Sequence, residues 1–232
     1  MNAKEPSGTG RASLKTRVKT ARKRSLASTL WLERQLNDPY VARAKAEGYR
    51  SRAAFKLVEI DSRYHILKRG QKVVDLGAAP GGWSQVAAAK VGATDGAGKV
   101  FGIDLLPVET IPGVDFRQLD FLIPEAPQIL TDWLGGPADV VLSDMAGNTT
   151  GHRKTDHLRI VGLVELAADF AAEILAPGGA FLAKVLQGGT ETSLLATLKR
   201  QFTEVRHVKP KASRADSSEL YVLATGFRGR AD

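Results

Sequence analysis

The sequence predicts an α/β fold in which helices cover both faces of a mostly parallel sheet. Between residues 72 and 186, short β-branched stretches alternate with helical stretches, which is the pattern of repeated βαβ units. The last two predicted strands have no helix between them, so they must pair antiparallel. A chain of 232 residues is long enough to bury the core of one such domain.

The predicted elements follow one another in a simple order. Apolar residues at helical spacing predict helices between residues 26 and 64. The longest helix is expected from about residue 155 to 175, and the sequence Pro177-Gly178-Gly179 ends it. Strands are expected at residues 72–76, 99–104, 114–120, 139–144, 180–186, 205–209 and 220–227, with a further helix at 194–202.

Residues 1–25 form a basic arm, which we separate from a single domain at 26–232. The first 24 residues contain eight lysines and arginines against one glutamate, which accounts for most of the net charge of +8. The arm is poor in apolar residues, so it cannot bury enough surface to order itself and is expected to be disordered when free. Its charge favours a role in binding nucleic-acid phosphates, and the alternative is a solubilising tail.

Composition argues against several classes of protein. The chain has no cysteine, so disulfides and thiolate metal sites are absent. Its four histidines lack the spacing of metal ligands, and no metal site is expected. Every apolar stretch is interrupted by charges, so neither export nor membrane insertion is expected. We therefore expect a cytoplasmic protein, with a monomer as the default.

The segment DLGAAPGGW, from Asp75 to Trp83, follows an apolar strand and precedes a helix, where nucleoside-containing cofactors bind in open α/β sheets. Ala79 stands where a dinucleotide motif needs its second glycine, so a dehydrogenase is disfavoured. Asp104 and Asp120 end the next two strands and can accept from ribose hydroxyls and an adenine amino group. Trp83 is either a platform beside the cofactor or a packing residue. The expected cofactor residues are Asp75, Gly77, Pro80, Gly81, Gly82, Trp83, Asp104, Asp120 and Asp144.

Four distant segments each place one ionisable residue in a setting that suits catalysis. They are Lys56 in SRAAFKL, Asp144 in VVLSDMA, Lys184 in GGAFLAKVLQG and Glu219 in SSELYVLATGF. Lys184 is the candidate base for removing a proton from a hydroxyl group. A lysine amine in water is protonated at neutral pH, so this role requires burial or a neighbouring cation such as Lys56. We expect Asp144 to orient the base, and Lys56 with Glu219 to hold the hydroxyl; the alternative is two ordinary ion pairs.

These motifs, in this order, resemble the FtsJ/RrmJ family of S-adenosylmethionine-dependent ribose 2′-O-methyltransferases. The likeness runs from about residue 40 to 227, through SRAAFKL, DLGAAPGGWSQ, DLLP, GVDF, SDMA, DHLR, LVELA, LAPGGAFLAKV, FTEV and SSELYVLATG. The resemblance implies a Rossmann-like class I methyltransferase, with a mostly parallel seven-stranded sheet that has one antiparallel strand. It also implies a catalytic tetrad of Lys56, Asp144, Lys184 and Glu219, and a methyl-donor pocket on Gly81, Trp83, Asp104, Asp120 and Asp144. One departure is Gly147, which replaces the usual proline and loosens its loop.

The function implied by the resemblance is methylation of a uridine ribose in large-subunit (23S) ribosomal RNA within the assembled 50S subunit. RNA is expected to contact the basic arm and five cations whose phosphate contacts position it: Arg50, Arg52, Lys209, Lys211 and Arg214. Each of these could instead belong to a solvated face. Two other functions stay open: the same chemistry on transfer RNA or an RNA cap, and a non-catalytic RNA-binding factor in ribosome assembly.

Overall fold

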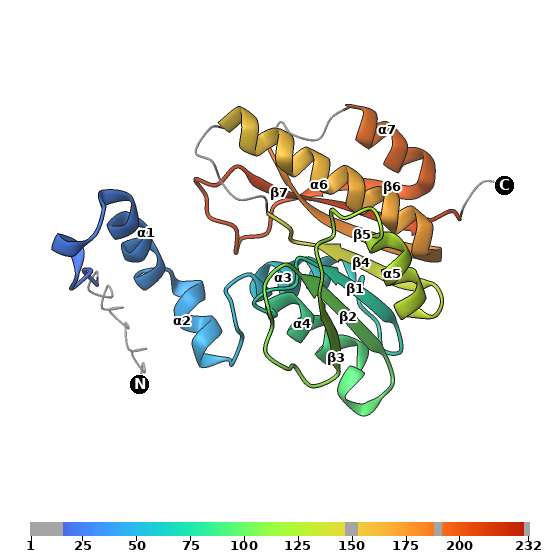
Figure 1. Ribbon diagram of the computed structural model, residues 1–232, viewed down its shortest axis with the longest axis horizontal. Helices are drawn as coiled ribbons and strands as arrows, with labels where there is room; N and C mark the ends of the chain where they lie inside the picture. The colour runs from blue at the N-terminus through green and yellow to red at the C-terminus, as the bar shows by residue number, and fades with distance from the viewer. Residues whose placement is uncertain (1–15, 147–152, 188–191, 230–232) are drawn as a thin grey trace, which may run out of the picture.

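The computed structural model describes residues 16–146, 153–187 and 192–229 and is built around one seven-stranded sheet (Figure 1). The strands are β1 (Lys72–Leu76), β2 (Lys99–Asp104), β3 (Val114–Gln118), β4 (Ala138–Ser143), β5 (Leu175–Leu186), β6 (Phe202–Val208) and β7 (Glu219–Phe227). The α-helices are α1 (Leu26–Leu36), α2 (Pro39–Ala46), α3 (Ala54–Tyr64), α4 (Gly82–Val91), α5 (Ala126–Leu134), α6 (Arg153–Ile174) and α7 (Thr192–Gln201). Two short 3₁₀ helices, Ala21–Lys23 and Ala93–Asp95, complete the described elements.

The strand order is β3-β2-β1-β4-β5-β7-β6. Strands β1 to β5 pair in parallel, and β7 runs antiparallel to both of its neighbours, β5 and β6. The prediction of a mostly parallel seven-stranded sheet with one antiparallel strand is confirmed. Because the strand order reverses direction between β1 and β4, a crevice opens there at the carboxyl ends of the strands, where ligands bind in folds of this kind.

Two apolar cores lie on opposite faces of the sheet because side chains alternate along each strand. Val74 and Leu76 of β1 join the core that contains residues of α5, α6 and α7. Val73, between them in sequence, points to the other face and joins the core that contains residues of α3 and α4. Helices therefore cover both faces, as Figure 1 shows and as the sequence predicts.

The start of β5 differs from the expected boundary. Helix α6 ends at Ile174, and the strand begins at the next residue, Leu175, which pairs with Ala138 of β4. The register between β4 and β5 then shifts, and the pairing resumes at Ala180. The Pro177-Gly178-Gly179 sequence therefore lies inside an irregular start of β5, whereas the sequence predicted that it ends the helix and that the strand begins at residue 180.

The N-terminal helices α1 and α2 project from one side of the domain (Figure 1). Asp38 caps α2 by accepting a hydrogen bond from the backbone N–H of Tyr40 at 3.0 Å. Asn37 exchanges hydrogen bonds with the backbone of Thr16, so the last part of the basic arm is tied to the end of α1. Gly147 and residues 1–15 lie outside the described residues. No helix in the described ranges is long and apolar enough to cross a membrane.

Candidate active site

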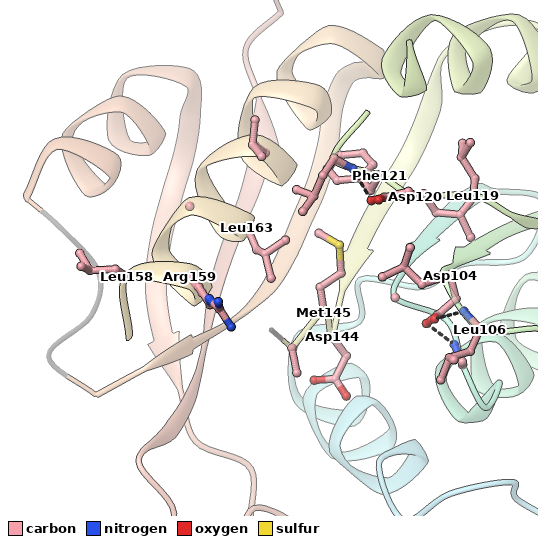
Figure 2. Close-up of a pocket in the computed structure, with 18 residues that line it drawn as sticks. Asp104, Leu106, Leu119, Asp120, Phe121, Asp144, Met145, Leu158, Arg159 and Leu163 are labelled. Carbon is pink, nitrogen blue, oxygen red and sulfur yellow. Dashed lines mark hydrogen bonds between the residues drawn. The ribbon is translucent and has the colours of Figure 1, made fainter. Parts of the chain in front are cut away.

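A cavity of about 710 Å³ opens at the carboxyl ends of β1 to β4, facing α6 (Figure 2). Asp104 is the last residue of β2, Asp120 lies just after β3, and Asp144 comes directly after β4, so three carboxylates reach its wall. The rest of the wall is mainly apolar, and α6 contributes several of these residues. The apolar lining residues are Ile103, Leu105, Leu106, Leu119, Phe121, Leu122, Met145, Leu158, Leu163 and Leu166.

The carboxylates of Asp104 and Asp120 are held by backbone N–H groups. Asp104 accepts from Leu106 at 2.8 Å and from Ala79 at 2.9 Å, and Asp120 accepts from Leu122 at 2.9 Å (Figure 2). A carboxylate has about four acceptor positions, so each retains capacity for a ligand. Fixed acceptors of this kind are suited to the hydroxyl and amino groups of a nucleoside.

The cavity fits an adenosyl cofactor that carries positive charge, such as S-adenosylmethionine. Its volume lies within the range of small-molecule sites, and its walls combine apolar side chains with a few placed polar groups. The apolar wall suits an adenine ring, while Asp104 and Asp120 suit ribose hydroxyls and an amino group. Asp144 adds a third carboxylate to the wall, which would suit the positive charge of a sulfonium group. Metal ligation has no comparable candidate, since the described residues contain no cluster of three or more His, Asp or Glu side chains able to hold an ion.

Not every predicted cofactor residue reaches the cavity. Gly77, Asp104, Asp120 and Asp144 line it, while Asp75, Pro80, Gly81, Gly82 and Trp83 do not. Gly77 has a φ of +77°, and a Cβ there would approach the Met145 backbone to within 2.9 Å, so a glycine permits this close approach. The Trp83 side chain is 3% exposed, donates its indole N–H to the Ala53 carbonyl at 2.8 Å and packs against Tyr221. Its side chain is therefore a packing residue of the helix start.

Asp75 is fully buried in β1 and does not line the cavity. The Ser84 hydroxyl donates to its Oδ2 at 2.6 Å, while its Oδ1 has no hydrogen-bond partner among the described residues. Burial, together with the nearby Asp144 and Asp104 carboxylates, raises the pKa of Asp75 to about 7, although the Ser84 hydrogen bond opposes this shift. Asp75 is therefore largely protonated below neutral pH, in contrast to a carboxyl group in water.

The raised pKa of Asp75 predicts a specific pH dependence of stability. Between about pH 4 and 7 the unfolded chain has lost this proton and the folded chain retains it, so the free energy of unfolding falls as pH rises. Between pH 5 and 8 this contribution amounts to about 3 kcal/mol. In Asp75→Asn the decrease should be smaller by that amount, as measured by urea unfolding of both proteins across this range. Parallel curves for the two proteins would contradict the assignment.

The four ionisable residues singled out in the sequence lie together as two ion pairs. Lys56 Nζ lies 2.7 Å from Glu219 Oε1 and 2.8 Å from its Oε2. Lys184 Nζ lies 3.2 Å from Asp144 Oδ1 and donates to the Asp144 backbone carbonyl at 2.6 Å. Tyr221 lies between the pairs: its hydroxyl donates to Asp144 Oδ1 at 3.0 Å, and its ring centroid is 5.7 Å from Lys56 Nζ.

Strand register explains why residues so far apart in sequence meet here. Lys184 of β5 lies opposite Tyr221 of β7, and opposed residues in an antiparallel pair share a face. Glu219 is two residues before Tyr221, so it points to that same face. Asp144 follows β4, which neighbours β5, and Lys56 enters from α3, which packs on this face.

Tyr221 was not among the residues predicted for the site. It is fully buried, and burial together with the carboxylates of Asp144 and Glu219 raises the pKa of Tyr221 well above its usual range. The phenol is therefore a neutral donor at any working pH. The signal that could have identified it is its position two residues after Glu219, which strand alternation places on the same face.

Tyr221→Phe should remove only the hydroxyl group, because the ring packs against Trp83 and Lys56 in the same way. We expect a loss of about 1 kcal/mol in the free energy of unfolding, the typical value for one hydrogen bond. If the site catalyses the expected methyl transfer, the rate should fall about tenfold at saturating cofactor, because Asp144 loses one of the donors that orient it. Single-turnover assays and urea unfolding measure both effects, and an unchanged rate would show that the hydroxyl has only a packing role.

Four of the five cations predicted to bind RNA already have internal partners. Arg50 donates to the carbonyl groups of Pro80, Glu109 and Thr110, and Lys209 donates to those of Ala215 and Ser217. Arg52 and Arg214 both pair with Asp38. Lys211 is exposed and has no hydrogen-bond or ion-pair partner in the described ranges. Binding of RNA by these residues stays a prediction, and the structure adds a bracing role for four of them.

Residues 49–227 match the model of the FtsJ-like methyltransferase family. The chain is 68% identical over 227 residues to Ribosomal RNA large subunit methyltransferase E of Xanthobacter autotrophicus, covering 98% of this chain and 89% of that protein. It is also 68% identical over 223 residues to the protein of the same name from Bradyrhizobium diazoefficiens, covering 96% and 97% of the two chains.

Among solved structures, the chain is similar to a Plasmodium falciparum protein assigned as a ribosomal RNA methyltransferase. The TM-score is 0.69 at 31% sequence identity, and the match covers 78% of this chain and all of the other. A second match, to a Lactococcus lactis protein described as a hemolysin, has a TM-score of 0.55 at 16% identity and speaks for the fold alone.

Proposed function

The chain belongs to the FtsJ-like methyltransferase family, and from this premise we propose that it transfers a methyl group from S-adenosylmethionine to a ribose 2′-hydroxyl in large-subunit ribosomal RNA. The acceptor nucleotide is a uridine, and the substrate is the assembled large subunit. The observation that supports this most strongly is that Asp144 both lines the cavity and pairs with Lys184. Asp144 therefore connects the cavity that suits the methyl donor with Lys184, the residue that suits proton removal.

Asp104, Asp120 and Asp144 are the residues that would hold the donor. When bound, S-adenosylmethionine would supply an electrophilic methyl group on a positively charged sulfur and would leave as the neutral thioether S-adenosylhomocysteine. The chain's own contribution is then to align an acceptor oxygen and remove its proton. A ribose hydroxyl is a weak nucleophile at neutral pH, so both contributions are needed.

Lys184 is the base in this proposal. The residue is 9% exposed, and two contacts of its amine with Asp144 fix its position. In its neutral form it accepts the proton that leaves the 2′-oxygen, and Asp144 then stabilises the resulting ammonium group. Lys56 and Glu219 hold the hydroxyl: the ammonium group donates to the 2′-oxygen and the carboxylate orients the ribose. Ser213, whose hydroxyl donates to Glu219 at 2.9 Å, keeps that carboxylate in place.

The substrate is tested by supplying labelled S-adenosylmethionine with three acceptors: large ribosomal subunits lacking the modification, naked large-subunit RNA and transfer RNA. We expect label in the RNA of the assembled subunit, and less in naked RNA. Label in transfer RNA alone would support the alternative substrate. An absence of label in all three, with donor binding intact, would support a non-catalytic RNA-binding factor.

A further inference from the structure

Two more hollows lie beside the site, on the side of Lys56 and Glu219. A hollow of about 290 Å³ is lined by Lys56 and Glu219 themselves, and a larger one of about 510 Å³ lies next to it. The two hollows adjoin, because they share Arg34, Arg52, Arg214 and Asp216 in their walls, and together they are called the groove. The donor cavity, in contrast, contains Asp144 and neither Lys56 nor Glu219. The two ion pairs therefore stand between the donor cavity and this groove.

The outer wall of the groove comes from α1 and α2, which are fixed to the domain by a buried carboxylate. Asp38, 8% exposed, pairs with Arg52 and also accepts from Arg214 Nη2 at 3.1 Å. At the start of α2, the Tyr40 hydroxyl donates to Glu59 at 3.0 Å, and Glu59 accepts from the backbone N–H of Ala212. The helices and the segment 209–218 before β7 are thus held against each other, and Figure 1 shows both on the same side of the domain.

The groove contains both paired and unpaired cations. Arg52 and Arg214 share the single carboxylate of Asp38, and Lys56 pairs with Glu219, so these cations are partly neutralised. Lys211, an exposed cation without a partner in the described ranges, also lines the larger hollow. Arg34 is exposed, lines both hollows, and its guanidinium has no ion-pair or hydrogen-bond partner among residues 16–146, 153–187 and 192–229. An unpaired arginine in a groove is well suited to bind a phosphate group through two parallel hydrogen bonds.

The larger hollow also has an apolar wall, formed by Leu30, Pro39 and Tyr40. Leu30 is 43% exposed there, although it is a large apolar residue. An unstacked nucleobase is a flat, mainly apolar group with a phosphate on either side, and proteins recognise single-stranded RNA by binding such bases on apolar and aromatic side chains. A hollow with one apolar wall and one unpaired arginine matches that chemistry.

We propose that this groove binds the RNA nucleotide next to the methylated one, with Arg34 on its phosphate and its base in the larger hollow. The proposal rests on the proposed function, since a ribose held by Lys56 and Glu219 places its neighbouring phosphate and base in the same groove. An RNA strand that enters through this groove also leaves the donor cavity free for the cofactor.

Arg34→Gln tests the phosphate contact, and Lys45→Gln is the matched control. Lys45 is an exposed cation of α2 that lies outside both hollows, so the two variants lose the same charge from the same part of the chain. With large ribosomal subunits as substrate, Arg34→Gln should raise the KM for the subunit about tenfold and leave the KM for the donor unchanged. The slope of log affinity against log salt should become about 0.7 to 0.9 units less steep.

Asp216→Asn is expected to change the KM for the subunit in the opposite direction. Asp216 is an exposed carboxylate that lines both hollows, so it repels a phosphate bound there. Its replacement should lower the KM for the subunit, an effect that general damage to the groove would not produce. If Arg34→Gln behaves like Lys45→Gln while the wild-type protein methylates subunits, the groove proposal is wrong and the proposed function stands. If the wild-type protein methylates no RNA, the proposed function fails first.

A chain without cysteine also permits a direct test of where the RNA lies. Leu30→Cys carries a single thiol in the wall of the groove, to which an iron–EDTA group can be attached. Radical cleavage of large-subunit RNA should then cluster next to the methylated nucleotide. Lys99→Cys, at the amino end of β2 and away from the site, is the control and should give no such cluster. Equal cleavage patterns from the two positions would overturn the proposal.

Discussion

Replacing Lys184 by alanine or arginine is expected to slow methyl transfer by about two to four orders of magnitude, the range contributed by a positioned general base. Alanine removes the amine, and arginine retains the positive charge beside Asp144 but stays protonated at any working pH. Single-turnover assays at saturating donor measure the rate, and calorimetry should show that the donor still binds, because Lys184 does not line the cavity.

Two measurements separate a base from a merely structural lysine. Added methylamine should partly restore the rate of Lys184→Ala, since a small amine can occupy the vacated space and accept the proton. Lys90→Arg, which alters a lysine paired with the buried Asp61 far from the site, should have the wild-type rate. Rapid turnover by Lys184→Arg would remove the base assignment.

Asp144→Asn is expected to have the second largest effect, a decrease in kcat of about two to three orders of magnitude. The substitution retains the shape of the side chain but removes the charge that orients Lys184 and stabilises its protonated form. Lys184 is 10% exposed in its side chain, so losing its partner should also lower the free energy of unfolding by about 2 kcal/mol. Single-turnover kinetics and urea unfolding measure the two effects.

Asp104→Asn is the informative comparison for Asp144→Asn. Asp104 lines the same cavity but lies outside the two ion pairs, and its backbone contacts with Ala79 and Leu106 fix its position. Its replacement should raise the KM for the donor and leave kcat nearly unchanged at saturating donor. If the two variants show the same pattern, the division between donor binding and proton removal is wrong.

Most of the fold could be predicted from the sequence because its signals are local. Alternating apolar residues and helical periodicity locate the seven strands to within a few residues, and the absence of a helix between β6 and β7 fixes their antiparallel pairing. The start of β5 could not be predicted, since proline and two glycines indicate a loop. Pairing of Leu175 with Ala138 overrides that local preference. The periodicity of a sequence does not show which strand a segment will pair with.

The site was predictable where topology alone determines it. Asp104, Asp120 and Asp144 meet because parallel strands end at one edge, and Lys56, Lys184 and Glu219 were expected from their motifs. The distribution of charged residues along the sequence does not show which residue each charged side chain pairs with. Arg52 and Arg214 have the sequence signature of RNA-binding cations, yet a single buried residue, Asp38, holds both. Trp83 is a similar case, because a tryptophan beside two glycines at a helix start is compatible with a platform for the cofactor and with a packing role. Only the burial of its side chain in the structure distinguishes these two roles.

The chemical identity of the product tests the central claim most directly. Large ribosomal subunits are methylated with labelled donor, and their RNA is hydrolysed in alkali, which requires a free 2′-hydroxyl to cut the adjacent phosphodiester bond. Two amines and two carboxylates beside a donor cavity predict transfer to that oxygen, so the label should remain in an alkali-resistant dinucleotide. Label released on a mononucleotide with a methylated base would contradict the account.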